Sequence, residues 1–151
     1  MDLYSTQPPV PVLVSTPDRD SSIFVRFDTG TTITGTTGKK VWDVSAGQRF
    51  VLKGGALLAF VTVDLPDDVT TGLLAFWDDS IASGNCVYPI AAYGPDERAN
   101  TALTDGVLRF DLGAGQASKA VSQDLFIGTS ETIDTGKIRV IGTLWGEEIS
   151  Q

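Results

Sequence analysis

The densest run of apolar residues lies in the middle of the chain, between residues 41 and 79. Glycines and a Pro-Asp-Asp turn divide this run into pieces of strand length. The segment Ala56–Asp64 is apolar at nearly every position, which is typical of a strand covered on both faces. We therefore expect Ala56–Asp64 to be a central strand, with Leu73–Trp77 as its antiparallel neighbour across the turn.

Other segments alternate apolar and polar side chains with the period of two that strands show. Two glycines separate Arg49–Lys53 from the predicted central strand, so we expect Arg49–Lys53 to be a separate strand. Pro89 favours an edge strand or a bulge, because proline cannot donate a ladder hydrogen bond. The remaining expected strands are Ile23–Phe27, Val41–Val44, Cys86–Tyr93, Val107–Leu112, Asp124–Ile127 and Ile138–Trp145.

This pattern predicts about eight to ten strands and no helix with a convincing 3.6-residue period. The predicted fold is all-β: an antiparallel β-sandwich, jelly-roll-like, formed by a single domain over residues 21–151. The side chains expected in its core are Phe50, Leu58, Phe60, Leu74, Phe76, Phe110 and Leu144.

Residues 1–20 are predicted to form an extended N-terminal arm. Four prolines in this segment exclude helix and limit pairing in a sheet. The arm is nevertheless more apolar than free tails usually are, so it should lie against a surface. That surface is an edge of its own sheet, a neighbouring copy or a larger assembly. The residues expected to make these contacts are Tyr4, Pro8, Pro9, Val10, Val12, Leu13 and Val14.

The formal charge is −8, from 11 basic and 19 acidic residues. Phosphate binding requires a basic face, so nucleic acid is not an expected partner, and an anionic membrane surface is disfavoured for the same reason. The N-terminus has neither the basic region nor the apolar core of a signal peptide, so we expect synthesis in a cytoplasm. A single cysteine, Cys86, excludes an intramolecular disulfide.

The chain contains no histidine. Ser–His and Cys–His nucleophile pairs are thereby excluded, and we predict neither enzymatic activity nor a cofactor. Carboxylates at one end of the predicted central hairpin could meet and bind calcium, or act as a glycosidase pair. Aspartate is also a common turn residue, and we favour solvated turns. The carboxylates of the calcium alternative are Asp64, Asp67, Asp68 and Asp78.

The aromatic residues allow a second alternative, a carbohydrate-binding module that stacks sugars on exposed rings. Tryptophans on strands are more often part of the core, which is the interpretation we favour. The residues concerned are Trp42, Trp77, Trp145, Tyr4, Tyr88 and Tyr93.

The phrases FVRFD, KVWDVSAGQRFVLKGG and LLAFWDD, within residues 23–79, carry a resemblance. Their order is similar to that of β-sandwich accessory proteins encoded among tailed-phage virion genes. The resemblance implies a capsid decoration (cement) protein on the virion surface, or another small structural virion component, made in the host cytoplasm. Its implied partners are the major capsid protein and copies of itself, as a trimer on local threefold sites. The alternative is a tail, fibre or free carbohydrate-binding module that recognises a glycan. This class shares no active site, so no functional residues carry over.

Overall fold

The computed structural model describes residues 22–30, 33–82, 84–112, 121 and 124–150. Within these residues the chain forms eight strands and no helix, which confirms the all-β prediction. None of them belongs to a helix long and apolar enough to cross a membrane. The arm predicted at residues 1–20, with all of its expected contact residues, lies outside the described part. The strands are β1 (Ser22–Asp28), β2 (Lys39–Trp42), β3 (Gln48–Val63), β4 (Gly72–Asp78), β5 (Cys86–Tyr93), β6 (Leu108–Asp111), β7 (Leu125–Thr129) and β8 (Lys137–Ser150).

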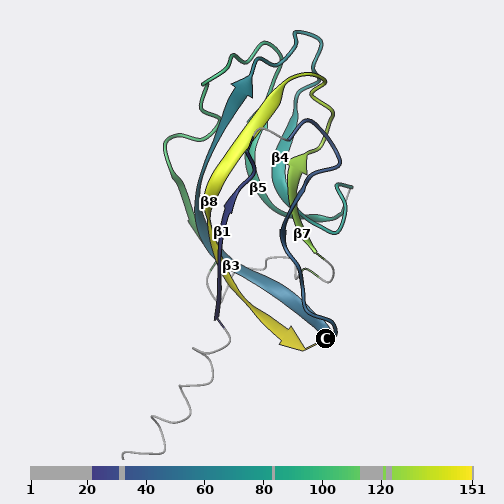
Figure 1. Ribbon diagram of the computed structural model, residues 1–151, viewed down its shortest axis with the longest axis vertical. Coiled ribbons are helices and arrows are strands. Elements are labelled where there is room, and N and C mark those ends of the chain that lie inside the picture. Colours follow the sequence, from purple (N-terminus) through teal and green to yellow (C-terminus); the bar gives the residue numbers. More distant parts are fainter. Residues whose placement is uncertain (1–21, 31–32, 83, 113–120, 122–123, 151) are drawn as a thin grey trace, which may run out of the picture.

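The strands form two antiparallel sheets of four strands each. Sheet A has the order β1-β8-β3-β6, and sheet B has the order β2-β7-β4-β5. Figure 1 shows the two layers, with β1, β3 and β8 on one side and β4, β5 and β7 on the other. The predicted antiparallel β-sandwich is thus confirmed. β5 is an edge strand, and its register against β4 shifts beside Pro89, as the proline indicated.

The longest pairing joins β3 to β8, from Gln48 opposite Ser150 to Val63 opposite Lys137. The prediction of two separate strands on either side of Gly54 and Gly55 is therefore wrong. Both glycines lie inside β3, beside a shift in register that marks a β-bulge. They are there because neighbouring side chains occupy the space that a Cβ would need.

The predicted hairpin between Ala56–Asp64 and Leu73–Trp77 is also wrong. β3 pairs with β6 and β8 in sheet A, whereas β4 pairs with β5 and β7 in sheet B. The loop between β3 and β4 crosses the sandwich, whose sheets pack about 10 Å apart. This arrangement buries the apolar inner faces of both strands in one core.

Only one face of β3 is fully covered. Leu57, Ala59 and Val61 point inward, and each is at most 1% exposed. Leu58 and Phe60 point outward and are half-buried, so their prediction as core residues is wrong. The run is apolar on both faces, but sheet B covers only one of them. The other five predicted core residues are confirmed as buried: Phe50, Leu74, Phe76, Phe110 and Leu144.

At the end of the sandwich where β8 finishes, Glu148 links the two sheets. Its Oε1 accepts hydrogen bonds from Trp42 Nε1 at 2.9 Å and from the Ser45 backbone N–H at 3.1 Å. Burial acts to raise the pKa of Glu148, but these hydrogen bonds to the charged form lower it overall. The carboxylate therefore stays ionised between the layers.

Candidate functional site: the outward face of sheet A

The outward face of sheet A is built by the strand alternation described above. Successive side chains of a strand point to opposite faces of the sheet, so every second residue of β1 and β8 points away from the core. The same holds on β3 and β6. We use the name "outward face" for these side chains. Its apolar members are Phe24, Val51, Ala56, Leu58, Phe60, Ile141, Trp145 and Ile149.

Large apolar side chains pair across the strands of this face. Phe24 lies directly opposite Trp145, and Leu58 lies directly opposite Ile141. Phe24 is 72% exposed and Ile141 is 37% exposed. Such cross-strand pairs stabilise a sheet, but here they also present apolar surface to solvent. Exposed apolar side chains that gather on one face of a sheet are common at interaction sites.

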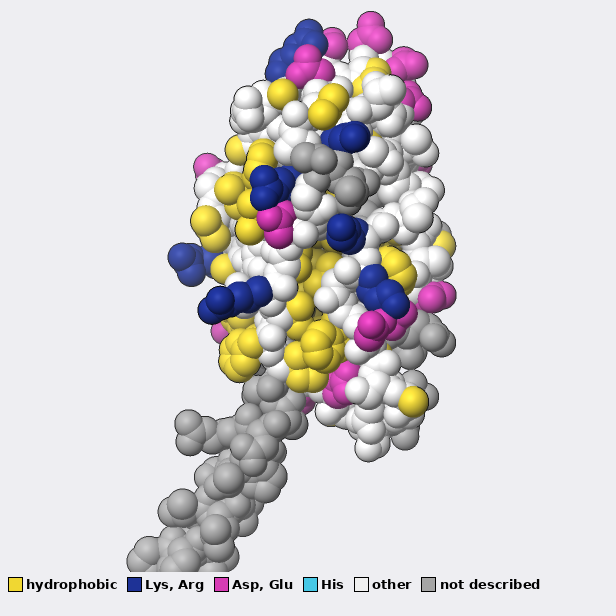
Figure 2. All heavy atoms as spheres, viewed as in Figure 1, with side chains coloured by type: hydrophobic (Ala, Val, Ile, Leu, Met, Phe, Trp, Pro, Cys, Tyr) yellow, Lys and Arg dark blue, Asp and Glu magenta, His cyan; other side chains and the backbone are white. Residues whose placement is uncertain are grey.

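The outward face also gathers positive charge on an otherwise acidic chain. Its cations are Arg26, Arg49, Lys53, Arg109 and Arg139, and its anions are Asp28, Asp111 and Glu147. Arg139 Nη2 lies 2.6 Å from Asp28 Oδ2, and Lys53 Nζ lies 3.4 Å from Glu147 Oε1. The hydrogen bond from Arg139 is the main reason why the pKa of Asp28 is lowered to about 2. In Figure 2, hydrophobic and Lys or Arg side chains intermingle over the left half of the view.

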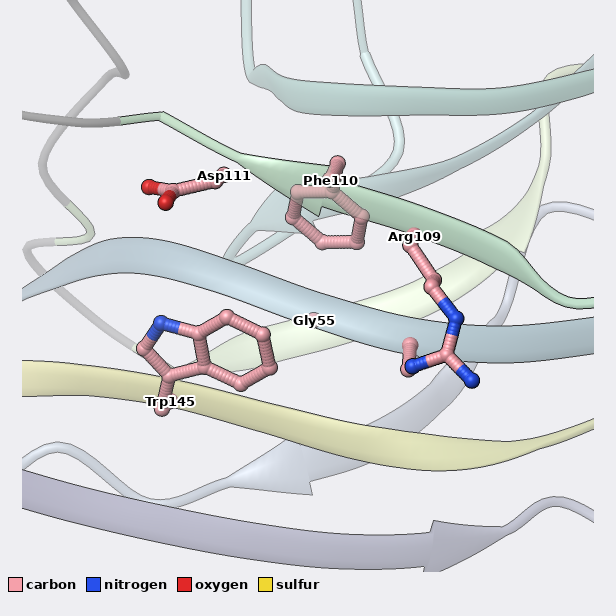
Figure 3. Close-up of a pocket in the computed structure, with 6 residues that line it drawn as sticks. Gly55, Arg109, Phe110, Asp111 and Trp145 are labelled. Atoms are coloured by element: carbon pink, nitrogen blue, oxygen red, sulfur yellow. The ribbon is translucent and has the colours of Figure 1, made fainter.

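Two shallow hollows open on this face. The first has a volume of about 310 Å³ and is lined by Gly55, Ala56, Arg109, Phe110, Asp111 and Trp145. The second has a volume of about 430 Å³ and is lined by Arg26, Phe27, Asp28, Ile141, Gly142 and Thr143. In Figure 3, the Trp145 ring extends from its strand into the first hollow, and Arg109 and Asp111 extend from β6 on either side of Phe110.

The three tryptophans differ in the acceptors to which their indole N–H groups donate hydrogen bonds. Trp77 is 5% exposed and donates to the Gly128 carbonyl at 3.0 Å, while Trp42 donates to Glu148. Trp145 forms no hydrogen bond to another described residue through its indole N–H. The prediction that strand tryptophans are core residues therefore holds for Trp77, whereas Trp145 lies on the outward face.

The carboxylates of the calcium alternative lie along different parts of the molecule. Asp64 follows β3 and accepts hydrogen bonds from the Ala99 backbone N–H at 2.7 Å and from Arg98 at 3.4 Å. Asp78 lies at the far end of β4, about 20 Å along the strand from the loop that holds Asp67 and Asp68. No cluster of three or more His, Cys, Asp or Glu suited to a metal occurs in the described part of the chain.

Our sequence analysis missed the outward face as a candidate site. The signal was the alternation in β1, where Phe24 has the same parity as the charged Arg26 and Asp28. A large aromatic residue on the charged side of a strand is exposed unless something covers that side. β8 carries the same signal, because Ile141 and Trp145 have the same parity as the charged Arg139 and Glu147.

Comparison of the chain with protein-family models, with curated proteins and with solved structures found no match.

Proposed function

We propose that this chain is a structural virion protein, a decoration (cement) protein that binds a phage head through the outward face. The observation that carries the proposal is the pair Phe24 and Trp145, large aromatic side chains that lie opposite each other on the solvent side of sheet A. Aromatic residues and arginines are the side chains most enriched at the energetic centre of protein interfaces. The outward face supplies both, on a rigid sheet that loses little entropy on docking.

The strand orders support the jelly-roll part of this proposal. The first and last strands are neighbours in sheet A, and every connection between consecutive strands changes sheet except the one from β4 to β5. That connectivity is what two interlocked Greek keys produce. A rigid, disulfide-free module of this kind suits a protein that is made in a cytoplasm and added to a finished shell.

The charge distribution supports a partner with acidic groups around an apolar centre. Cations on the outward face attract such a partner and fix its orientation, while the apolar pairs supply most of the affinity. We propose the major capsid protein as this partner. Copies of the chain would assemble as trimers, since local threefold sites of a shell favour closed trimers.

The proposal is tested by mixing the purified chain with undecorated phage heads and measuring the bound protein by sedimentation. Phe24→Ser should weaken binding at least tenfold, because it removes an exposed anchor without touching the core. Ala92→Ser, at an exposed position on β5 in the other sheet, is the control and should bind normally. A Phe24→Ser variant that binds heads as tightly as the unaltered chain would remove the outward face from the proposal.

A second candidate function is recognition of a glycan, and Trp145 is the observation that favours it. A half-buried indole whose N–H bonds to no other described residue, beside Arg109 and Asp111, has the groups with which proteins stack and hydrogen-bond a sugar ring. Binding to a glycan array that is abolished by Trp145→Ala, together with no binding to heads, would establish this candidate in place of the first.

A further inference from the structure

We infer that β1 pairs with β1 of a second copy of this chain, antiparallel and edge to edge, so that sheet A of one copy continues into sheet A of the other. This contact goes beyond the proposed function, because it does not require a phage head. It relates two chains by a twofold axis, so it is separate from the threefold assembly proposed above.

β1 lacks the features that keep other edge strands from pairing. Among the described edge strands, β5 contains Pro89 and two shifts in register, and β2 and β6 are only four residues long. β2 also carries two lysines and a shift in register. β1 has seven residues without proline or lysine, and its register against β8 is continuous. An edge strand of this kind is a template for another strand.

The open edge of β1 offers backbone donors and acceptors at alternate residues. The Thr29 N–H donates to the Val140 carbonyl at 3.0 Å, so the odd-numbered residues along β1 bond to β8. The N–H and C=O groups of Phe24 and Arg26 therefore point to the open edge, where no described strand lies. A strand that pairs there antiparallel places its own outward-pointing backbone groups opposite these residues, since a hydrogen-bonded pair exchanges both bonds.

The sequence of β1 favours a second β1 as that strand. When two copies pair about Val25, the whole of Ser22–Asp28 has a partner, and Phe24 lies opposite Arg26 of the second copy. Phe24 is 72% exposed, and the exposed Arg26 forms no ion pair with another described residue. An arginine beside an aromatic ring is a favourable cross-strand pair. Every other register of this parity leaves part of the strand unpaired, and the register centred on Arg26 places two arginines opposite each other.

Apolar side chains on the core side of β1 fit the same register. Ile23 and Phe27 are half-buried and pack against the core. Ile23 of each copy lies opposite Phe27 of the other in a non-hydrogen-bonded pair, where side chains approach most closely. On the other side of the sheet, Phe24 lies between Trp145 of its own chain and Arg26 of the second copy. The twofold axis is perpendicular to the combined sheet, so the two outward faces become one.

The test uses the full-length chain in the absence of heads. Sedimentation equilibrium over a wide range of concentration should show the molecular mass doubling. Amide hydrogen exchange is followed by NMR on the same samples. The N–H groups of Phe24 and Arg26 should exchange about tenfold more slowly in samples of doubled mass than in samples of undoubled mass. Those of Val25 and Phe27, which bond to β8 of their own chain, should exchange slowly in both.

Charge variants test the register. Phe24→Arg should abolish the doubling, because the new arginine faces Arg26 of the second copy. Adding Arg26→Glu to this variant should restore the doubling, since the new arginine and the new glutamate then face each other across the contact. Arg109→Glu makes the same charge change on β6, at the opposite edge of sheet A, and is the control that should leave the doubling intact. Circular dichroism and melting temperature establish that each variant is folded.

The inference is overturned if the mass does not double, or if Arg26→Glu fails to restore the doubling in the Phe24→Arg chain. It is also overturned if Phe24 and Arg26 exchange slowly in samples of undoubled mass, because the chain then covers this edge itself. Head binding is measured separately. Doubling without head binding would uphold the inference and refute decoration. Head binding by a chain whose mass never doubles would refute only the inference.

Discussion

The indole ring of Trp145 on β8 lies across the backbone of Gly54, its partner in the register of β3. A Cβ at position 54 would overlap the ring and would also lie within 2.7 Å of the Phe110 carbonyl oxygen. Gly54 is therefore needed for close packing inside a strand and not for a turn. The same contact places the Trp145 ring against the sheet, where it borders the hollow.

We predict that Gly54→Ala lowers the free energy of unfolding by about 1–3 kcal/mol, because the added methyl group has no room. Trp145→Ala in the same chain should relieve part of this cost, so that the double variant is less destabilised than the sum of the two single variants. Denaturant unfolding measures all three. Gly94→Ala is the control and should change stability little, since its Cβ would meet only Thr71 Oγ1 at 3.8 Å. Strict additivity would mean that the ring and Gly54 are not in contact.

A phenylalanine in the core, Phe76, and one on the outward face, Phe60, should differ in their contribution to stability. Phe76 is fully buried and packs edge-to-face on Phe27, with ring centroids 6.0 Å apart. Phe76→Ala should therefore cost about 3–5 kcal/mol. Phe60 lies half-buried on the outward face, so Phe60→Ala should cost about 1–2 kcal/mol. Equal losses in denaturant unfolding of the isolated chain would contradict the assignment of Phe60 to a solvent-facing side.

The carboxyl group of Asp28 should titrate abnormally. Arg139 donates to both of its oxygens, at 2.9 and 2.6 Å, and the backbone N–H of Gly30 donates at 2.8 Å. Together they lower its pKa from 3.8 to about 2. Because the pKa is lowered in the folded state, the ion pair contributes its full stabilisation at pH values above the ordinary pKa of an aspartate. Its contribution is lost as the pH falls from about 4 to about 2.

Arg139→Gln should therefore raise the pKa of Asp28 toward 3.8, as followed by NMR of the carboxyl carbon. It should also reduce stability more at neutral pH than below pH 2, where Asp28 of the unaltered chain is mostly protonated and the pair is broken. Arg98→Gln removes a cation elsewhere and should leave the Asp28 titration in place. An Asp28 pKa that does not respond to Arg139→Gln would show that the ion pair does not persist in solution.

Glu148 should stabilise the contact between the two sheets at the end of the sandwich where β8 finishes. Glu148→Ala leaves the Trp42 indole N–H and the Ser45 backbone N–H without their acceptor, and we expect a loss of about 1–3 kcal/mol. Because the pKa of Glu148 is lowered, its contribution should disappear on acidification. Glu147→Ala is a suitable control, since Glu147 points to the outward face and, among the described residues, forms an ion pair only with the half-exposed Lys53. Similar losses for both variants would contradict the role assigned to Glu148.

The sequence alone determined which segments become strands. Alternation and turn residues identified the regions of all eight strands, because a strand's side-chain period and its terminating glycines and prolines are local properties. Cys86–Tyr93 was correctly expected to be an edge strand or to contain a bulge, since proline cannot donate a ladder hydrogen bond whatever lies around it. The absence of histidine and the excess of acidic residues likewise follow from the sequence without any structure.

Tertiary structure decided which strands share a sheet and which faces are covered. Leu57 and Leu58 are chemically equal neighbours, yet one is buried and the other faces outward, because sheet B covers only one side of β3. Gly54 was expected to end a strand, but it lies inside β3. A glycine is needed there because the ring of Trp145, 91 residues away in sequence, occupies the space of a side chain. Both outcomes depend on contacts between distant segments, which the side-chain pattern of β3, apolar on both faces, does not specify.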